Sequence, residues 1–180
     1  MMESPEQHPD GEQEASSEVR DGAQGWIDDE DGFSGNPQTK LDERGRLKMP
    51  AEFRAVIEKK YGAGFNAFHL TTVKMDVALI YPMPEWKKRK AIIQSMPATS
   101  NARIVLEKRD AVLGGDVVMD PQGRLLIPER LRKQVELSGE VLVYGSGDHL
   151  QVSSLSKLMD EIMTMQFNDA DMDQLQKLGL

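Results

Sequence analysis

The chain carries an internal repeat, and no other feature of the sequence constrains its fold as strongly. Residues 41–58 read LDERGRLKMPAEFRAVIE, and residues 119–136, which lie 78 positions later, read MDPQGRLLIPERLRKQVE. The two segments align without a gap, share seven identical positions and place apolar residues at equivalent points. A repeat of this kind indicates that one supersecondary unit occurs twice. The identical pairs are Asp42/Asp120, Gly45/Gly123, Arg46/Arg124, Leu47/Leu125, Pro50/Pro128, Arg54/Arg132 and Glu58/Glu136.

Within the first copy, the local signals are those of a strand, a turn, a second strand and a short helix. Asp42 and Gly45 bracket the turn, because Gly supplies backbone freedom and Asp supplies a nearby hydrogen-bond acceptor. Pro50 stands where the first helical residue is expected, a position at which its missing N–H costs nothing. The second copy presents the same three residues 78 positions later, so we expect it to fold in the same way.

Paired strands are expected after each of the two short helices. Apolar runs predict strands at 68–72 and 77–81 in the first half, and at 141–144 and 149–152 in the second. The segment Gly145-Ser146-Gly147-Asp148 joins the second pair as an ordinary hairpin loop. The sequence therefore predicts an α+β, β-rich protein in which each half is strand, turn, strand, short helix and hairpin.

Helices are expected in two further places. Between the halves, helices are predicted at 85–96 and 101–113, the second capped by Thr99 or Ser100. Another, amphipathic helix is predicted over 155–163, and the chain beyond it is expected to fray. The predicted divisions are a disordered acidic tail (1–31), a first half (32–82), a helical connector (83–115), a second half (116–154), and a C-terminal helix with a frayed tail (155–180).

Charge is distributed unevenly along the chain. The formal net charge of -8 argues at first against a surface that meets phosphates with Lys and Arg. Residues 1–36, however, carry a balance of -10 and residues 160–180 a balance of -4, which leaves +6 on residues 37–159. Residues 1–31 have too few apolar groups to offset the entropy of ordering. This tail is either a solubilising extension or an acidic arm that competes with DNA for the basic body.

Composition disfavours several kinds of site. Cysteine is absent, which excludes disulfides and thiolate metal sites and suits a reducing cytoplasm. His8, His69 and His149 are scattered singly and indicate neither a metal site nor a catalytic base; the last two are interpreted as packed or edge residues. The sequence has no signal-peptide pattern and no apolar run long enough to span a membrane. We therefore expect a soluble cytoplasmic protein that is not an enzyme and uses no cofactor or metal.

The repeated segments and their surroundings resemble the MraZ family of transcriptional regulators, which carry tandem SpoVT-AbrB domains. The resemblance implies a swapped-hairpin AbrB-like fold in each half, with the halves forming a pseudo-twofold, β-barrel-like unit with added helices. It also implies a ring-like homo-oligomer that binds direct repeats in double-stranded promoter DNA, typically of the division and cell-wall gene cluster, and that associates with the nucleoid. The matching segments are 33–36, 40–54, Tyr81-Pro82, Glu85-Trp86, 120–128 and 143–148.

The candidate DNA contacts lie in the repeated turn and in the strand after it. Residues two apart on a strand share a face, so Arg44, Arg46 and Lys48 are predicted to point together while Leu47 and Met49 turn inward. Arg46 is the best candidate for a bidentate base contact, and its neighbours for phosphate contacts. The predicted contacts are Arg44, Arg46, Lys48 and Arg124, with Asp42, Asp120, Gly45 and Gly123 supporting the motif.

Structural interpretations of these residues stay open beside the functional ones. Each Asp–Arg pair is also explained as an ion pair that braces a turn, and the two roles are compatible because an oriented Arg loses less entropy on binding. Arg54 and Arg132 are expected to be solvated or to contact another subunit. The run Lys87-Lys88-Arg89-Lys90 is expected to be an exposed helical face more than a DNA contact.

Three hypotheses for the function follow. The first is a sequence-specific DNA-binding transcriptional regulator, a repressor, that acts as an oligomer on repeated half-sites. The second is a protein-interaction scaffold that keeps the fold, has lost DNA binding and uses the acidic arm or the Met-rich C-terminal helix for a partner. The third is an AbrB or antitoxin-type regulator of another branch, which the tandem repeat disfavours because such proteins usually have one half per chain.

Overall fold

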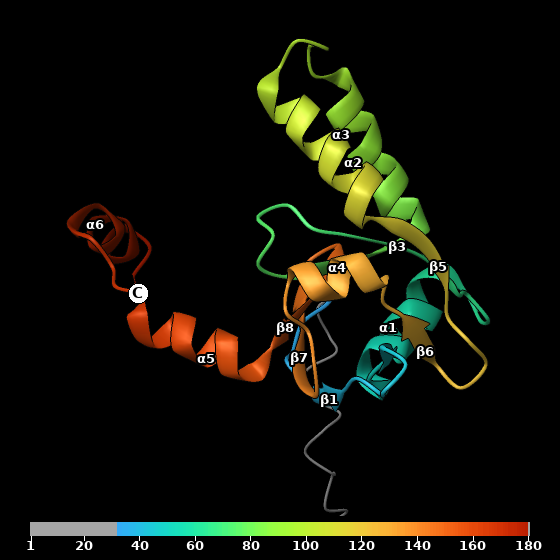
Figure 1. Ribbon diagram of the computed structural model, residues 1–180. Coiled ribbons are helices and arrows are strands. Elements are labelled where there is room, and N and C mark those ends of the chain that lie inside the picture. The colour runs from blue at the N-terminus through green and yellow to red at the C-terminus, as the bar shows by residue number, and fades with distance from the viewer. Residues whose placement is uncertain (1–31, 180) are drawn as a thin grey trace, which may run out of the picture.

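The fold is α+β, as predicted, and is described for residues 32–179 of a computed structural model (Figure 1). The expectation that the acidic tail is disordered concerns residues 1–31, which lie outside the described residues. The described part contains one six-stranded sheet, a separate two-stranded ribbon and six helices.

The large sheet is antiparallel throughout, with the strand order β1-β7-β8-β4-β3-β5. The hairpins predicted in both halves are confirmed as β3-β4 and β7-β8. Ser146 pairs with His149, so the second hairpin turns through Gly147 and Asp148 alone and its strands are longer than expected. The strands are β1 (Gln38–Lys40), β3 (Ala67–Thr71), β4 (Ala78–Pro82), β5 (Gly115–Val118), β7 (Glu140–Ser146) and β8 (His149–Ser154).

The two halves of the chain are interleaved in this sheet. β1 belongs to the first half and pairs with β7 of the second, whereas β5 of the second half pairs with β3 of the first. If each strand of one half is exchanged for its counterpart in the other, the result is the same strand order read from the opposite edge of the sheet. The sheet therefore has the symmetry of a pseudo-twofold axis between β4 and β8, which pair at its centre.

The same axis passes through the separate two-stranded ribbon. β2 (Arg46–Lys48) and β6 (Arg124–Leu126) are the equivalent strands of the two repeats, and they pair antiparallel. Leu47 lies opposite Leu125, its own counterpart in the repeat. Two backbone bonds extend the ribbon, from Met49 N–H to the Gly123 carbonyl (2.8 Å) and from Ile127 N–H to the Gly45 carbonyl (3.1 Å).

A closed barrel is not confirmed. Among residues 32–179 the six strands form an open order with β1 and β5 at its two ends, and the ribbon is a second sheet. β1 and β2 belong to different sheets, and an isolated antiparallel bridge between Leu41 and Leu47 joins the segments on either side of the turn between them. In place of the barrel-like closure that the resemblance implies, the described residues show two sheets, and one pseudo-twofold axis relates the two halves within each of them.

A short helix follows the ribbon strand in each repeat, as predicted. The proline was expected to be the first helical residue. In both helices it is instead the N-cap residue, and the helix begins one residue later. Ser100 caps the predicted connector helix at 101–113 by position, without a side-chain hydrogen bond. The four helices are α1 (Ala51–Tyr61), α2 (Met83–Ser95), α3 (Asn101–Leu113) and α4 (Glu129–Gln134).

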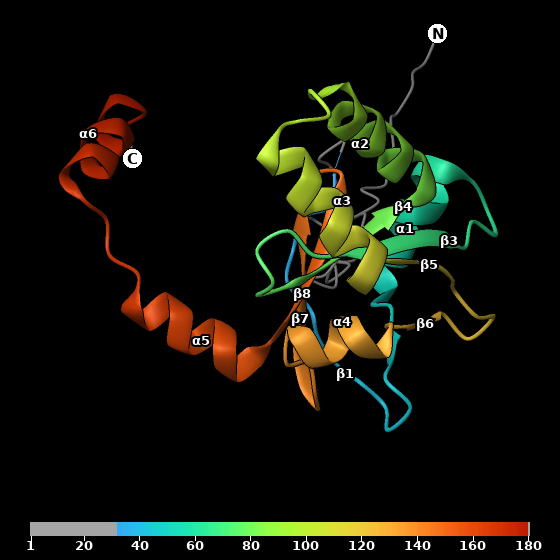
Figure 2. The same cartoon turned by 45° about the horizontal axis from the view of Figure 1, so that its top comes forward.

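The C-terminal segment differs from its prediction. α5 (Leu155–Thr164) is the expected amphipathic helix, but the residues that were expected to fray form α6 (Asp169–Lys177). A capping box begins α6, because the Asn168 side chain accepts from the Asp171 N–H while the Asp171 carboxylate accepts from the Asn168 N–H. In two views α5 and α6 extend away from the sheet as an arm (Figures 1 and 2).

The hydrophobic core lies between the ribbon, α1, α4 and the large sheet. Leu47 and Leu125 are fully buried at the pseudo-twofold axis, and α1 and α4 contribute Phe53 and Leu131. Equivalent residues of the two repeats thus line one common core, so neither half buries its apolar face alone. The largest fully buried side chains are Phe53, Phe68, Leu47, Met49, Ile57, Leu70, Ile80, Leu125, Ile127, Leu131, Leu150 and Val135.

Neighbouring leucines on β6 offer a matched test of this core. Leu125 has no exposed surface, whereas the Leu126 side chain is about half exposed. We expect Leu125→Ala to lower the free energy of unfolding by about 2–5 kcal/mol, because it leaves a cavity at the axis. Leu126→Ala should change it by less than about 0.5 kcal/mol. Chemical denaturation at one protein concentration measures both, and equal losses would contradict the assigned burial.

Candidate nucleic-acid interface

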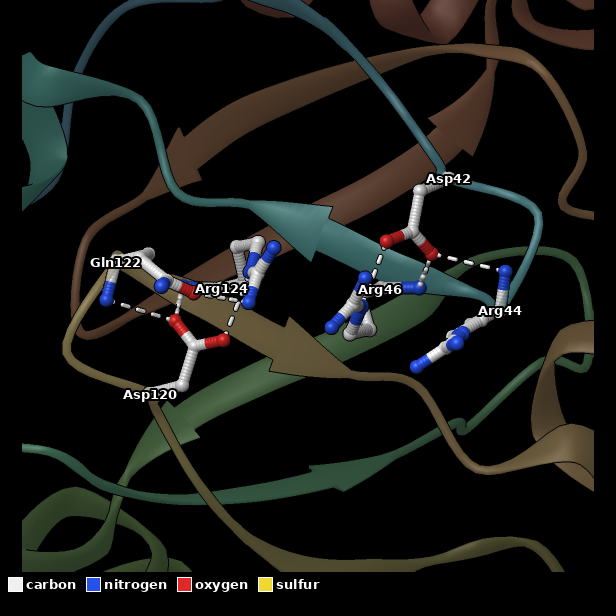
Figure 3. Close-up of polar contacts among 6 residues, drawn as sticks. All are labelled: Asp42, Arg44, Arg46, Asp120, Gln122 and Arg124. Atoms are coloured by element: carbon white, nitrogen blue, oxygen red, sulfur yellow. Dashed lines mark hydrogen bonds and ion pairs between the residues drawn. The ribbon is translucent and has the colours of Figure 1, made fainter.

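An aspartate organises the first repeated turn. Asp42 Oδ1 accepts hydrogen bonds from the backbone N–H groups of Arg44 (3.0 Å) and Arg46 (2.9 Å). Its Oδ2 accepts from Nε of the Arg46 side chain at 2.6 Å. One carboxylate thus fixes both the turn and the arginine that follows it (Figure 3).

The second turn repeats this geometry. Asp120 Oδ1 accepts from the N–H groups of Gln122 and Arg124, both at 2.9 Å, and its Oδ2 accepts from Arg124 Nε at 2.7 Å. Arg124 also donates from Nη2 to the Gln122 side chain. The two turns lie at opposite ends of the β2-β6 ribbon (Figure 3).

Both aspartates are held in the charged form. The backbone hydrogen bond from Arg46 is the main cause that lowers the pKa of Asp42 below its ordinary value, and the Arg46 side chain adds to it. For Asp120, desolvation opposes ionisation, but the side-chain and backbone hydrogen bonds from Arg124 outweigh it and its pKa is also lowered. Both carboxylates are therefore ionised at neutral pH.

The pairing leaves part of each guanidinium available. The carboxylates engage Nε, and the arginine side chains keep 29% (Arg46) and 30% (Arg124) of their surface exposed. Within residues 32–179, the two Nη nitrogens of Arg46 have no hydrogen-bond partner. The structure thus has the ion pair of the structural interpretation together with the free donor groups that a DNA contact requires.

The predicted contact residues are placed on or beside the ribbon. Arg46 and Lys48 alternate with buried Leu47, so the expected inward and outward alternation is confirmed on β2. Arg44 is exposed in the turn before β2, because Gly45, at φ 78°, interrupts the strand. Lys48 lies opposite Arg124 in the ribbon. DNA contact by these residues stays a prediction.

The two ends of the ribbon differ in the origin of their cations. Arg44 and Lys48 of the first repeat correspond to Gln122 and Leu126 of the second. The first end therefore carries Arg44 and Arg46 of one repeat, whereas the other end carries Arg124 together with Lys48, which lies opposite it in the ribbon.

Of the two expectations for Arg54 and Arg132, the solvated position is wrong, while contact with another subunit stays a prediction. Neither is simply solvated, because each is half-buried against the turn of the opposite half. A Cβ atom added to Gly123 would lie 3.1 Å from Arg54 Nη1, and one added to Gly45 would overlap the Arg132 guanidinium. The sequence signal was present, since the two arginines are an identical pair in the repeat, but it did not say which turn each would meet.

The histidines in strands are packed, as interpreted. His69 is buried, stacks on Trp86 at 3.9 Å between ring centroids, and has ring nitrogens 2.8 Å from Asp110 and 2.6 Å from Asp116. Burial opposes its protonation, but hydrogen bonds to these two carboxylates outweigh burial and raise its pKa. His149 stacks on Tyr81. In the described part of the chain, no group of three or more His, Cys, Asp or Glu side chains is arranged to hold a metal.

The basic run on α2 is an exposed helical face that is partly used within the chain. Lys88 Nζ lies 2.9 Å from Glu85 Oε2, and Arg89 Nη2 lies 3.3 Å from Asp148 Oδ2. Its interpretation as a helical face is thus consistent with the structure. Across residues 32–179, no helix combines the length and apolar character needed to cross a membrane.

Comparison with known proteins gives one consistent result. Residues 115–175 match the model of the family described as "MraZ protein, putative antitoxin-like". The chain is similar to the transcriptional regulator MraZ of Koribacter versatilis, with 36% identity over 82% of this chain and 99% of that protein. The protein of the same name from Acidobacterium capsulatum is 34% identical over the same shares, and that of Nitrosomonas europaea is 32% identical over 73% of this chain and 87% of its own.

Two glycines test how closely the Arg132 guanidinium approaches the first turn. Gly45 and Gly35 both have positive φ, 78° and 95°, but a Cβ on Gly35 would meet nothing within 4 Å. An alanine at either position should cost about 1–2 kcal/mol of backbone strain. Gly45→Ala should also displace the far end of the flexible Arg132 side chain, which should add less than about 0.5 kcal/mol. Chemical denaturation measures both, and a much larger loss for Gly45→Ala would show that Arg132 is held firmly against the turn.

Proposed function

The chain belongs to the MraZ family, whose relatives are named transcriptional regulators, and from this premise we propose that it regulates transcription by binding promoter DNA through the β2-β6 ribbon. The observation that carries the proposal is the pair of arginines, Arg46 and Arg124, each fixed by an aspartate at one end of the ribbon. An arginine oriented in advance loses less entropy when it binds, and its free Nη groups match the acceptors of guanine or phosphate.

The proposal gives each residue of this surface a role. Arg46 would make the bidentate base contact, while Arg44 and Lys48, both exposed, would meet phosphates. Arg124 would act at the other end of the ribbon, where its Nη2 also contacts Gln122. Asp42, Asp120, Gly45 and Gly123 would shape the turns without touching DNA.

We extend the proposal to the assembly. The protein would act as a repressor, a ring-like homo-oligomer on direct repeats in the promoter of the division and cell-wall gene cluster, in the cytoplasm and associated with the nucleoid. When several subunits of one oligomer bind spaced half-sites, their weak individual affinities combine into a high overall affinity. The interleaved halves would be the swapped-hairpin unit of the family, and no catalysis or cofactor would be involved.

The C-terminal arm supports the proposal of self-association. Met163 and Phe167, on α5 and in the linker to α6, are 79% and 72% exposed. A group of exposed apolar side chains on an arm that leaves the body is typical of an interaction surface. The exposed members on α5, the linker and α6 are Met159, Ile162, Met163, Met165, Phe167 and Met172.

The alternative is a protein-interaction scaffold of the same fold that has lost DNA binding. The same apolar arm favours it, because such a surface would serve a different protein equally well. The two hypotheses differ in the ribbon, which the scaffold would not use. Failure of the full chain and of a chain lacking residues 1–31 to bind any duplex would favour the scaffold.

Arg46→Ala tests the ribbon directly. We expect it to weaken binding to the chain's own upstream region by about 1–3 kcal/mol and to reduce discrimination against a scrambled duplex. Lys87→Ala, on the exposed face of α2, is the matched control and should bind like the wild type. Fluorescence anisotropy at several salt concentrations measures both, and undiminished binding by Arg46→Ala would contradict the assignment.

A pair of charge-matched variants tests the arm. Met163→Asp with Phe167→Asp should yield a smaller particle, because the carboxylates would be buried without partners at the interface between copies. Thr164→Asp with Gln166→Asp adds the same charge at exposed polar positions between them and should leave the assembly intact. Light scattering after size exclusion gives the mass of each variant. If the two variants have the same mass, the apolar residues of the arm are not needed for self-association.

A further inference from the structure

Two arginines from the short helices lie beside the turns of the candidate DNA surface, each on the opposite half. Arg132 extends from α4 to Gly45, which stands between Arg44 and Arg46 in the first turn. Arg54 extends from α1 to Gly123, whose added Cβ would lie 3.1 Å from Nη1 and 3.2 Å from Cδ. The two contacts are related by the pseudo-twofold axis, so the arrangement occurs twice independently in one chain.

Neither guanidinium has an acidic partner. Within residues 32–179, no ion pair and no side-chain hydrogen bond involves Arg54 or Arg132, and the buried Nε of Arg54 has no acceptor. Glu129 stands one helical turn before Arg132, and its pKa is lowered chiefly by Lys133, with only a small contribution from Arg132. By contrast, Arg46 and Arg124 are each paired with an aspartate.

A half-buried cation without a partner is costly, because burial removes water that no other group replaces. Both equivalent positions of the repeat nevertheless carry such a cation. The buried glycines beside them leave room for the guanidinium, since a Cβ atom at Gly45 would displace Arg132 and one at Gly123 would crowd Arg54. An arrangement that keeps a cation uncompensated in the free protein is suited to an anion that arrives with the ligand.

We propose that Arg54 and Arg132 bind backbone phosphates of DNA, each beside the turn of the opposite half. The inference rests on the proposed function and deepens it, because each contact region then combines residues of both repeats. Arg132 joins Arg44 and Arg46 at one end of the ribbon, and Arg54 joins Arg124 at the other. Two Nη groups that emerge beside a turn can hold one phosphate bidentately, without regard to base sequence.

The salt dependence of binding distinguishes a phosphate contact from a structural role. For the full-length Arg54→Gln/Arg132→Gln variant, the slope of log K against log salt should become less steep by about 0.9 for each phosphate that is no longer neutralised. The decrease in affinity should be the same for the upstream region and for a scrambled duplex. Arg130→Gln, which removes an exposed arginine from the same helix as Arg132, should leave the slope unchanged.

A charge-preserving variant covers the case in which the glutamines disturb the fold. Arg54→Lys/Arg132→Lys keeps the cations but removes the planar fork, so it should bind more weakly with nearly the wild-type slope. Weakened binding by the glutamine variant with an unchanged slope would overturn the inference and leave a packing role. If the glutamine variant binds like the wild type while Arg46→Ala binds weakly, the inference is overturned and the proposed function stands. If the wild type binds no duplex, the inference and the proposed function are both overturned.

Discussion

The antiparallel contact between Leu47 and Leu125 is the constraint on which the rest of the molecule depends. It joins two equivalent residues of the repeat to each other, so it fixes the pseudo-twofold axis and the register of both ribbon strands at once. A slip of one residue would turn both leucines from the core to the surface. The burial of this pair therefore sets where Arg46 and Arg124 emerge, and the same axis organises the large sheet through β4 and β8.

The turns use a small set of interactions to present charge at an exposed place. One carboxylate accepts two backbone N–H groups and one guanidinium N–H, so the conformation of the turn and that of the arginine are coupled. The glycine that follows has a positive φ, which allows the chain to enter the ribbon and allows an arginine from the other half to lie against the backbone. Turn, ion pair and helix thus cooperate across the two halves.

Much of the local structure could be predicted from the sequence, whereas the partners of its elements could not. The repeat indicated the strand, turn, strand and helix of each half, and the helix at 101–113 has the predicted bounds. The pairing of β1 with β7 was not predictable, because a period of apolar residues identifies a strand but not its neighbour. For the same reason the positions of Arg54 and Arg132 on their helices were known while the turns that they contact were not. The helix α6 was missed because fraying was expected near the end of the sequence, although a signal was present, an asparagine followed three residues later by an aspartate.

A duplication within one chain differs from a symmetric dimer in that its two copies are free to diverge. Here Arg44 and Lys48 of one copy stand where the other has Gln122 and Leu126, although the backbone keeps its twofold geometry. The two ends of the ribbon are consequently different: one presents two arginines of the first repeat, and the other presents Arg124 together with Lys48. An exactly twofold-symmetric dimer matches palindromic DNA sites, because its two halves are identical. A surface whose two ends differ favours DNA sites that are repeated in the same orientation.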